Sequence, residues 1–191
     1  DWMPIERIDR NMVRAVIAAE DSKFCSHHGF DTDAIAAAMR SNAAGNRVIR
    51  GGSTISQQTA KNAFLWQGGG YFRKGLEAWF TVLMETFWSK DRILEMYLNV
   101  AETGKGRFGV EATAQSCFKR SALRITRAQA ALIAAVLPSP RRWNACAPSA
   151  FVQNRQAWIM RQMAQLGELM DPAERRRLDA LQDRRDDRRE R

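Results

Sequence analysis

Several features that would place the chain in a specialised class are scarce or missing. Its 191 residues include 3 cysteines, and none of them forms a CxxC pair or a zinc-binding spacing. That number is too small for a disulfide-stapled mini-protein, and it leaves open whether Cys117 and Cys146 pair. No apolar run approaches the roughly 18 residues that a membrane span needs. With 12 glycines and 5 prolines, the composition also excludes a collagen-like or low-complexity chain.

Acidic residues are outnumbered, because 30 Lys and Arg face 21 Asp and Glu and leave a net charge of +9. Such a surplus attracts anions such as nucleic acid, anionic lipid or phosphorylated substrates. Most of the basic residues are Arg, so a biased genome composition explains the total equally well. A hydrophobic content of 45% is enough to bury a core. At about 150 residues per domain, the length predicts one domain, with room for a small appendage.

The apolar spacing predicts an almost entirely helical chain without a β-strand of useful length. Long helices are expected over residues 72–87 and from Asp91 onward, and Pro138 and Pro140 should end the helix before them. Residues 174–191 are dense in charge and predict a solvated helix or a frayed tail. The expected helix starts, in chain order, are Asp9, Asp31 or Asp33, Ser53 or Thr54, the capping box from Thr126 to Gln129, and Asp171.

The predicted helix over residues 72–87 is unusually apolar in its second half. Its large side chains occupy more than one face, so the helix is either central to the core or meets lipid on one side. We expect most of them in the core, with an aromatic edge near Phe64 and Trp66 suited to docking at an interface. These side chains are Trp79, Phe80, Val82, Leu83, Met84, Phe87 and Trp88.

The first segment with chemical potential is a pair of carboxylates, Glu20 and Asp21, at the end of a predicted helix. Followed by a loop with His27 and Gly29, they could form an acid–base centre. The plainer alternative is a helix end with two solvated acids. His27 and its neighbour His28 make a poor metal site, since adjacent residues do not share a helix face.

The second segment opens with Gly51 and Gly52 and continues as a helix with a broad polar stripe that carries one charge, Lys61. Glycines at a helix start leave backbone N–H groups for an anion. Lys61 lies about 12 Å along the axis from Ser53, so the two would contact different parts of one extended ligand. A capped helix with an ordinary polar side explains these residues equally well. The stripe consists of Ser53, Thr54, Gln57, Gln58, Lys61 and Asn62.

The third segment places Arg73, Lys74 and Glu77 within one helical turn. Arg73 and Glu77 are four residues apart, and alone they favour a surface ion pair of small worth.

Taken together, these segments resemble the peptidoglycan glycosyltransferases, glycosyltransferase family 51. The first motif of that family, Glu-Asp-x-x-Phe-x-x-His-x-Gly, is matched by Glu20, Asp21, Phe24, His27 and Gly29. The second is matched by Gly51, Ser53, Thr54, Ile55, Gln57, Gln58, Lys61 and Asn62, and the third by Arg73, Lys74 and Glu77. The fourth is matched by Lys90, Ile93, Leu94, Tyr97, Leu98 and Asn99, and the fifth resembles residues 108–112. The resemblance runs from about residue 2 to about residue 167, and it is to the monofunctional biosynthetic branch, because no transpeptidase domain follows.

The resemblance implies an all-α, lysozyme-like fold with a groove that faces the membrane, as one domain over residues 1–170 with a charged tail over residues 171–191. The family polymerises lipid II into peptidoglycan strands by inverting glycosyl transfer, and undecaprenyl pyrophosphate leaves. By this resemblance Glu20 is the general base for the acceptor's 4-hydroxyl, and Glu77 is the second catalytic carboxylate. The implied substrate-binding residues are Asp21, Phe24, His27, Ser53, Thr54, Gln58, Lys61, Asn62, Arg73 and Lys74.

The same resemblance implies the partners and the location of the protein. The partners are lipid II, the growing lipid-linked strand and the membrane surface, with cell-wall synthesis or division proteins as further candidates and no nucleic acid. No tightly bound cofactor is expected, and a divalent cation, Mg²⁺ or Mn²⁺, is a candidate at the pyrophosphate. Because the chain begins at Asp1 without a visible signal peptide, we expect an upstream transmembrane helix that holds it at the periplasmic face of the bacterial inner membrane.

Two other functions compete with the transferase. A lysozyme-like muramidase also needs two carboxylates, but it has no use for a cationic pyrophosphate site, so Lys61, Arg73 and Lys74 favour the transferase. A basic nucleic-acid-binding module is permitted by net charge, but the basic residues are scattered rather than arranged along one helix. The transferase hypothesis requires that Glu20 and Glu77 converge across a cleft with a positively charged floor.

Overall fold

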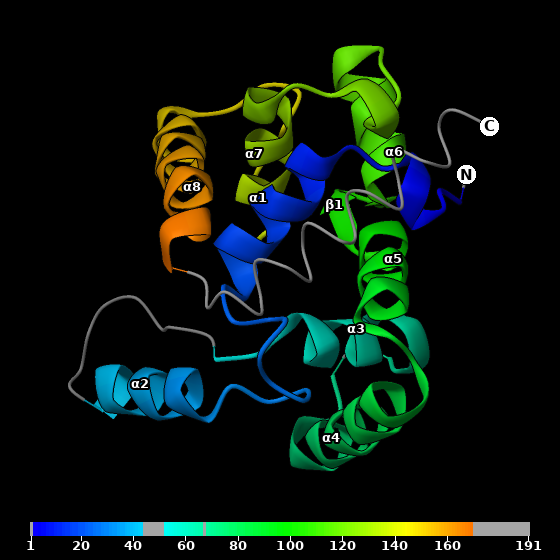
Figure 1. Ribbon diagram of the computed structural model, residues 1–191, viewed down its shortest axis with the longest axis vertical. Coiled ribbons are helices and arrows are strands. Elements are labelled where there is room, and N and C mark those ends of the chain that lie inside the picture. The colour runs from blue at the N-terminus through cyan, green and yellow to red at the C-terminus, as the bar shows by residue number, and fades with distance from the viewer. Residues whose placement is uncertain (1, 44–51, 67, 170–191) are drawn as a thin grey trace.

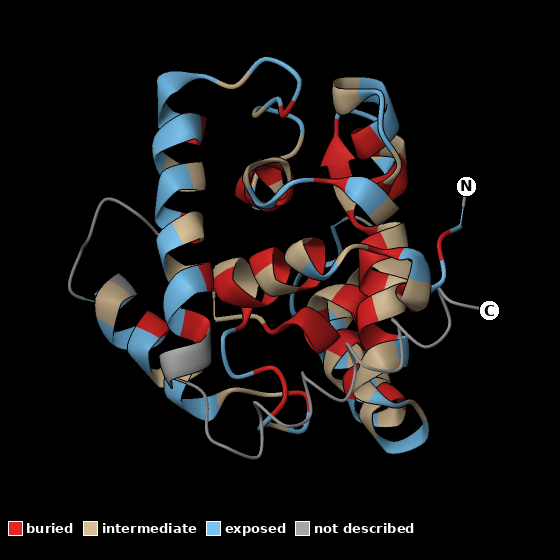
Figure 2. Ribbon diagram, turned by 45° about the horizontal axis from the view of Figure 1, so that its top comes forward, coloured by how far each residue is buried: buried red, intermediate tan, exposed pale blue. Residues whose placement is uncertain are grey.

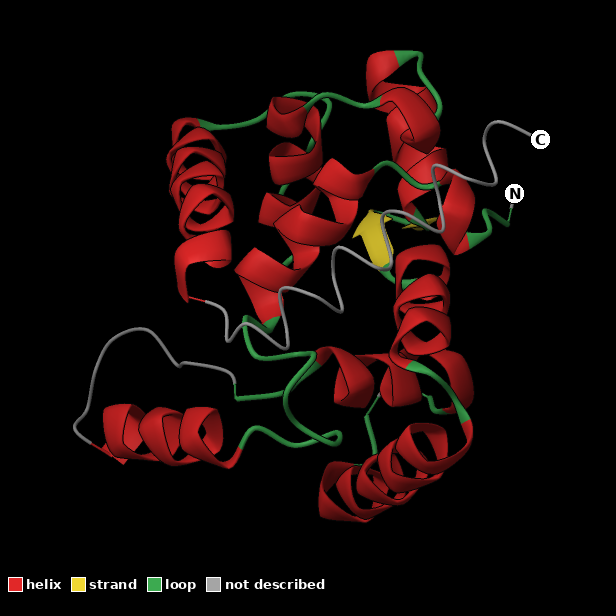
Figure 3. Ribbon diagram, viewed as in Figure 1, coloured by secondary structure: helices red, strands yellow, loops and turns green. Residues whose placement is uncertain are grey.

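The computed structural model describes residues 2–43, 52–66 and 68–169, and helices dominate it, which confirms the all-α prediction (Figures 1 and 3). The N-terminal half contains η1 (Ile5–Arg7), α1 (Arg10–Glu20), α2 (Thr32–Ala43), α3 (Ile55–Phe64), α4 (Gly70–Phe87) and α5 (Lys90–Val100). The C-terminal half contains β1 (Glu102–Gly104), β2 (Arg107–Phe108), α6 (Val110–Thr113), η2 (Ala114–Phe118), η3 (Ala122–Arg124), α7 (Arg127–Val136) and α8 (Ala150–Leu169).

One group of helices, α1, α7 and α8, supplies about half of the buried apolar residues of the core. The segment Ala130–Val136 of α7 is buried throughout, and its many alanines let α1 and α8 approach closely on either side. Figure 2 shows that α8, the long vertical helix at the left, keeps its outer face exposed. The sequence analysis gave no bounds for α8, although Val152, Ile159 and Met163 are buried at helical spacing.

The second group consists of α3 packed against α4 and α5, below the first group in Figure 1. The buried positions of α4 are Glu77, Thr81 and Met84, which form one narrow stripe. Trp79, with 61% exposure, and Phe87, with 77%, lie on the outer side, so the expectation that most of the large side chains of this helix are in the core is wrong. The reason is that α4 packs at the edge of the molecule and has a neighbour along one face.

The predicted helix starts are mostly confirmed. Asp9 caps α1, and the capping boxes that begin at Thr54 and Thr126 are both present. Asp31 accepts a hydrogen bond from the Ala34 N–H over 2.9 Å at the start of α2. Ser89 caps α5, so this helix begins one residue before the predicted Asp91. The helix expected after Asp171 and the division between residues 170 and 171 lie outside the described residues.

A short antiparallel hairpin joins α5 to α6, and it was not predicted. β1 and β2 pair Glu102 with Phe108 and Gly104 with Arg107. Strands of three and two residues are too short to show an alternating pattern, so the sequence carries no periodic signal for them. The hairpin matters because Glu102 and Phe108 line a cavity described below.

The cysteine question that the sequence left open is resolved. Cys117 and Cys146 form a disulfide that links η2 to the connection between α7 and α8, and Cys25 is buried and lies outside this disulfide. None of the helices in the described ranges combines the length and the apolar character that a bilayer crossing requires.

Candidate active site

Glu20 is the last residue of α1, and its carboxylate is held at one oxygen. Gln58 of α3 donates from Nε2 to Oε2 of Glu20 over 3.0 Å. No hydrogen-bond donor among the described residues reaches Oε1, although the side chain is only 11% exposed. Glu20 lines a cavity of about 440 Å³ together with Ser53 before α3 and with Trp158 and Gln162 of α8, which we call the Glu20 cavity.

Burial raises the pKa of Glu20, because it removes water from the charged form. The hydrogen bond from Gln58 opposes this effect, as do the charges of Arg155 and Lys61, whereas the neighbouring Asp21 adds to it. A buried carboxylate with a raised pKa and one unengaged oxygen has the properties of a general base.

Asp21 connects the end of α1 to the start of α3. Its Oδ2 accepts a hydrogen bond from the Ile55 N–H over 3.0 Å, and His27 Nε2 lies 2.9 Å from Oδ1. The N-terminus of α3 was expected to leave N–H groups for a bound anion. The anion that the structure places there is the chain's own Asp21 carboxylate, which satisfies a helix N-terminus in the usual way.

Residues of α4 and α5 contact the loop that follows Asp21 and hold it in place. Phe24 is buried with Lys90 Nζ 4.6 Å from its ring centre, and the same Nζ donates to the His27 carbonyl over 2.7 Å. Gly29 has a φ of +89°, and a Cβ there would lie 2.8 Å from Thr81 Cγ2. These contacts explain why the loop needs this phenylalanine and this glycine, and they give Phe24 and His27 a place in shaping the loop.

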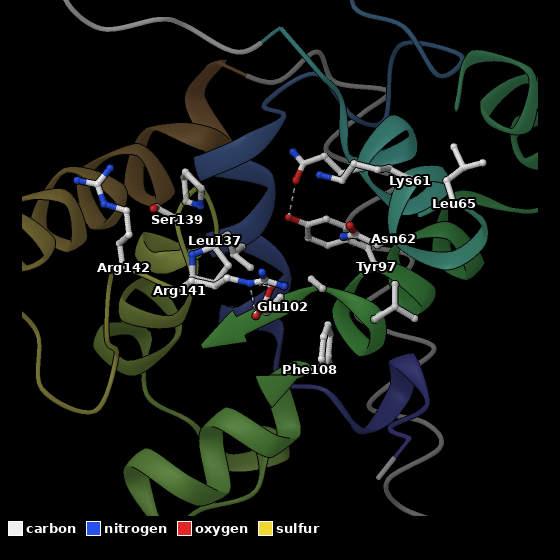
Figure 4. A pocket seen from close by; sticks show the side chains of 15 residues that line it. Lys61, Asn62, Leu65, Tyr97, Glu102, Phe108, Leu137, Ser139, Arg141 and Arg142 are labelled. Carbon is white, nitrogen blue, oxygen red and sulfur yellow. Dashed lines mark hydrogen bonds and ion pairs between the residues drawn. The ribbon is translucent and has the colours of Figure 1, made fainter. Parts of the chain in front are cut away.

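The polar side chains of the second segment lie in two different environments, one inside the fold and one at a cavity. Thr54 is buried and donates from its hydroxyl to the Gly29 carbonyl over 2.6 Å, and Gln57 is buried as its partner in the capping box. These two side chains are engaged in the fold. Gln58, Lys61 and Asn62 instead line a second cavity of about 550 Å³, which we call the Lys61 cavity (Figure 4).

The wall opposite Lys61 comes from the hairpin and from the connection after α7, as Figure 4 shows. Arg141 Nε donates to both carboxylate oxygens of Glu102, over 3.1 and 3.0 Å. Partial burial opposes ionisation of Glu102, but hydrogen bonds from the Gly106 N–H and from Arg141 outweigh it and lower the pKa of Glu102. The cavity therefore keeps a mixed lining in which cations predominate.

Tyr97 of α5 orients the side-chain amide of Gln58, which lies between the two cavities. Its hydroxyl donates to Gln58 Oε1 over 3.1 Å, which turns Gln58 Nε2 toward Glu20. Complete burial raises the pKa of Tyr97 well above its ordinary value, and the charge of Glu20 adds to this, so the hydroxyl keeps its proton and remains a donor.

Glu77 lies in a separate charged cluster on α4. Arg73 donates to Glu77 Oε2 over 3.0 Å, and Lys74 pairs with Oε1. Lys74 also reaches Ser53 Oγ at 3.4 Å, and Ser53 lines the Glu20 cavity. Among the described residues neither cavity is lined by Arg73, Lys74 or Glu77, so the expected convergence of Glu20 and Glu77 is not met at either cavity. Lys74 and Ser53 instead connect the Glu77 cluster to the Glu20 cavity.

A metal site does not emerge from the described part of the chain. It contains no group of three or more His, Cys, Asp or Glu side chains placed to hold an ion. In addition, both oxygens of Glu77 are engaged by cations.

The sequence analysis missed the contribution of α8 to this site. Trp158 and Gln162 line the Glu20 cavity, and an amino nitrogen of Arg155 lies 3.7 Å from Glu20 Oε1. None of these residues belongs to the five motifs, and the helical spacing of the apolar residues of α8 was the available signal that this helix exists.

The chain was compared with known proteins. The family model described as Transglycosylase matches residues 1–164. The chain is 59% identical over 167 residues to the "Biosynthetic peptidoglycan transglycosylase" of Pseudomonas putida, which covers 87% of this chain and 70% of that protein. It is 55% identical over 169 residues to the protein of that name from Aeromonas hydrophila, covering 88% of this chain and 72% of that protein. For the Escherichia coli protein of that name, identity is 58% over 167 residues, covering 87% and 69%.

Geometry and comparison agree on the class of protein. Glu20 provides a largely buried carboxylate that lines one cavity, and the mostly helical fold is the lysozyme-like one that the motifs imply. The chain therefore belongs to the transglycosylase family and is a glycosyltransferase enzyme.

Proposed function

We propose that this enzyme synthesises peptidoglycan by polymerising lipid II, and that each inverting transfer releases undecaprenyl pyrophosphate. The relatives named biosynthetic peptidoglycan transglycosylases support peptidoglycan as the product. The single observation that carries the mechanism is the state of Glu20, whose side chain is 11% exposed, bound at Oε2 and without a hydrogen-bond donor at Oε1 among the described residues.

Glu20 acts as the general base. Its Oε1 takes the proton from the 4-hydroxyl of the acceptor sugar as the hydroxyl oxygen forms a bond to the anomeric carbon of the donor. The bond between that carbon and the diphosphate oxygen breaks on the opposite face, and the electron pair leaves with the undecaprenyl pyrophosphate. Gln58 holds the other carboxylate oxygen throughout, so the base keeps its orientation.

The departing diphosphate needs positive charge where its own charge grows. Lys61 meets this need most directly, because it lines the Lys61 cavity beside the neutral side chains of Gln58 and Asn62. Arg73 and Lys74 act from the other side, with Glu77 holding both in place, so the cluster retains one net positive charge. Ser53 and Asn62 provide neutral hydrogen-bonding groups at the two cavities.

The residues that the structure describes contain no cluster of side chains placed to hold a divalent cation, and both Glu77 oxygens are already paired with cations. We therefore propose that Mg²⁺ or Mn²⁺ serves as a counter-ion carried by the diphosphate of the substrate. No step of the transfer is assigned to it.

The outer face of α4 and the turn before it are proposed to lie against the membrane that holds the lipid. Exposed aromatic side chains concentrate there, and such side chains favour the membrane interface. The Cys117–Cys146 disulfide supports an oxidising compartment, which fits the periplasmic face of the inner membrane. The exposed aromatic residues are Phe64, Trp66, Tyr71, Phe72, Trp79 and Phe87.

The test is incubation of the protein with purified lipid II, with polymer and undecaprenyl pyrophosphate quantified separately. The proposal predicts that both appear, with one undecaprenyl pyrophosphate released for each bond formed. A parallel incubation with purified sacculi should release no soluble fragments. Soluble fragments from sacculi without consumption of lipid II would identify a muramidase instead.

A further inference from the structure

Arg155 faces the carboxylate of Glu20 from α8, a helix that contains none of the five sequence motifs. One of its amino nitrogens lies 3.7 Å from Glu20 Oε1, which is within ion-pairing distance but too long for a hydrogen bond. The Arg155 side chain is 26% exposed and that of Glu20 is 11% exposed. The pair is therefore shielded from water, and its electrostatic interaction is stronger than that of an exposed surface pair.

The guanidinium also contacts an aromatic ring of its own helix. Its central carbon lies 6.0 Å from the ring centre of Trp158, one turn further along α8. Arg155 Nε is buried and has no hydrogen-bond partner among the described residues. The guanidinium donates no hydrogen bond to Glu20 Oε1, so this oxygen keeps its lone pairs available.

A shielded general base has two requirements that oppose each other, and the position of Arg155 satisfies both. Glu20 must be shielded so that it can take a proton efficiently, but shielding favours its neutral form. A second hydrogen bond would restore the charged form and at the same time occupy the oxygen that must accept the proton. A cation at 3.7 Å favours the charged form without occupying that oxygen.

We propose that Arg155 is a positioning residue for glycosyl transfer, whose guanidinium keeps the Glu20 carboxylate ionised while leaving Oε1 open to the acceptor hydroxyl. This inference rests on the proposed role of Glu20 as the base. It predicts that the positive charge at position 155 matters and that the planar shape of the guanidinium does not.

Other charges also act on Glu20, so the test must separate Arg155 from them. Asp21 follows it at the end of α1 and disfavours its charged form, Lys61 of α3 favours the charged form, and buried Tyr97 of α5 stays neutral. Asp31, before α2, lines the same cavity. All four remain in place when residue 155 is changed.

The experiment compares wild type with Arg155→Gln, Arg155→Lys and Arg161→Gln. Arg161 is an exposed residue of the same helix, so its replacement removes the same charge from α8 without touching Glu20. The carboxyl of Glu20 is titrated by carbon NMR in chains labelled at glutamate, with its resonance assigned by comparison with Glu20→Gln. We expect the pKa of Glu20 to rise in Arg155→Gln and to stay at the wild-type value in Arg155→Lys and Arg161→Gln.

The pH dependence of lipid II polymerisation provides the functional readout. In Arg155→Gln the acid limb of kcat/KM should move to higher pH, with a loss of about tenfold on that limb that recovers at alkaline pH. A merely structural role would lower activity equally at every pH. Arg155→Lys keeps the test valid if Arg155→Gln does not fold, because an acid limb displaced in the lysine variant would contradict a role that depends on charge alone.

The outcomes distinguish this inference from the proposed function. An unchanged Glu20 titration in Arg155→Gln overturns the role of Arg155, whatever the activity shows. A shifted titration with an unchanged acid limb shows that Glu20 is not the base, which overturns both the catalytic role of Arg155 and the proposed mechanism.

Discussion

Glu20 and Glu77 are both largely shielded from water, with side chains 11% and 4% exposed, but different groups contact their carboxylate oxygens. Glu77 has a cation on each oxygen, Arg73 on one and Lys74 on the other. Glu20 has an amide on one oxygen and a cation at 3.7 Å from the other, too far for a hydrogen bond. A carboxylate saturated by cations is a stable negative anchor, whereas one with a shielded and unengaged oxygen can accept a proton.

The difference predicts unequal losses of activity. Glu20→Gln removes the base and should lower kcat for lipid II polymerisation by about three orders of magnitude. Glu77→Gln leaves Arg73 and Lys74 charged but without their anchor, so about a tenfold to hundredfold loss is expected from misplacement. Both variants are assayed on the same lipid II preparation, and equal losses would break the distinction between the two glutamates.

For folding stability we expect the opposite order, with the larger loss in the Glu77 variant. Glu77→Gln leaves two cations around a neutral side chain that is 4% exposed in wild type, which should reduce the free energy of unfolding by about 2–3 kcal/mol. Urea denaturation measures this loss. The control is Asp33→Asn, which breaks an exposed pair with Lys23 and should cause no measurable loss. A stable Glu77→Gln chain would show that the cluster is not an anchor.

The helix that carries Glu77 also offers a test of the proposed membrane face. Trp79→Ser combined with Phe87→Ser removes two exposed aromatic side chains from α4 and should weaken binding to anionic lipid vesicles about tenfold. Co-sedimentation measures the binding. Phe151→Ser on α8 is the matched control, since it removes an exposed aromatic from another part of the molecule. Equal weakening by the control would remove the special role of α4.

The smallest expected effect is the pH dependence of stability that Glu20 causes. Because burial raises its pKa above the ordinary 4.5, the folded state binds a proton that the unfolded state has lost in the window just above that value. The free energy of unfolding of wild type, relative to Glu20→Gln, should therefore fall as pH rises through this window, by at most about 1.4 kcal/mol per pH unit. Thermal unfolding of both chains at several pH values measures the difference. A difference that grew with pH would contradict the raised pKa.

Much of the fold could be predicted from the sequence because its signals are local. The capping box at Thr126 and the predicted caps at Asp9 and at Ser53 or Thr54 depend on residues within one turn, and the structure has caps at Asp9, Thr54 and Thr126. The hairpin of β1 and β2 and the exposure of Trp79 could not be predicted. The hairpin is too short to show a periodic pattern, and the exposure of Trp79 depends on which helices pack against α4.

The candidate site shows the same division. The motifs identified Glu20, Gln58 and Lys61, which the structure places at adjoining cavities. They did not show that Asp21 occupies the N-terminus of α3. They also gave no indication of Arg155, which lies 135 residues after Glu20 in the sequence. The packing of α8 on α1 brings the two side chains together.

The most direct test of the central claim is the pH profile of lipid II polymerisation by wild type and by Glu20→Gln. If Glu20 must lose its proton before it can act, kcat/KM of wild type falls about tenfold per pH unit on the acid side. The residual activity of Glu20→Gln should then lack this acid limb. A residual activity that kept the same acid limb would show that another group is the base.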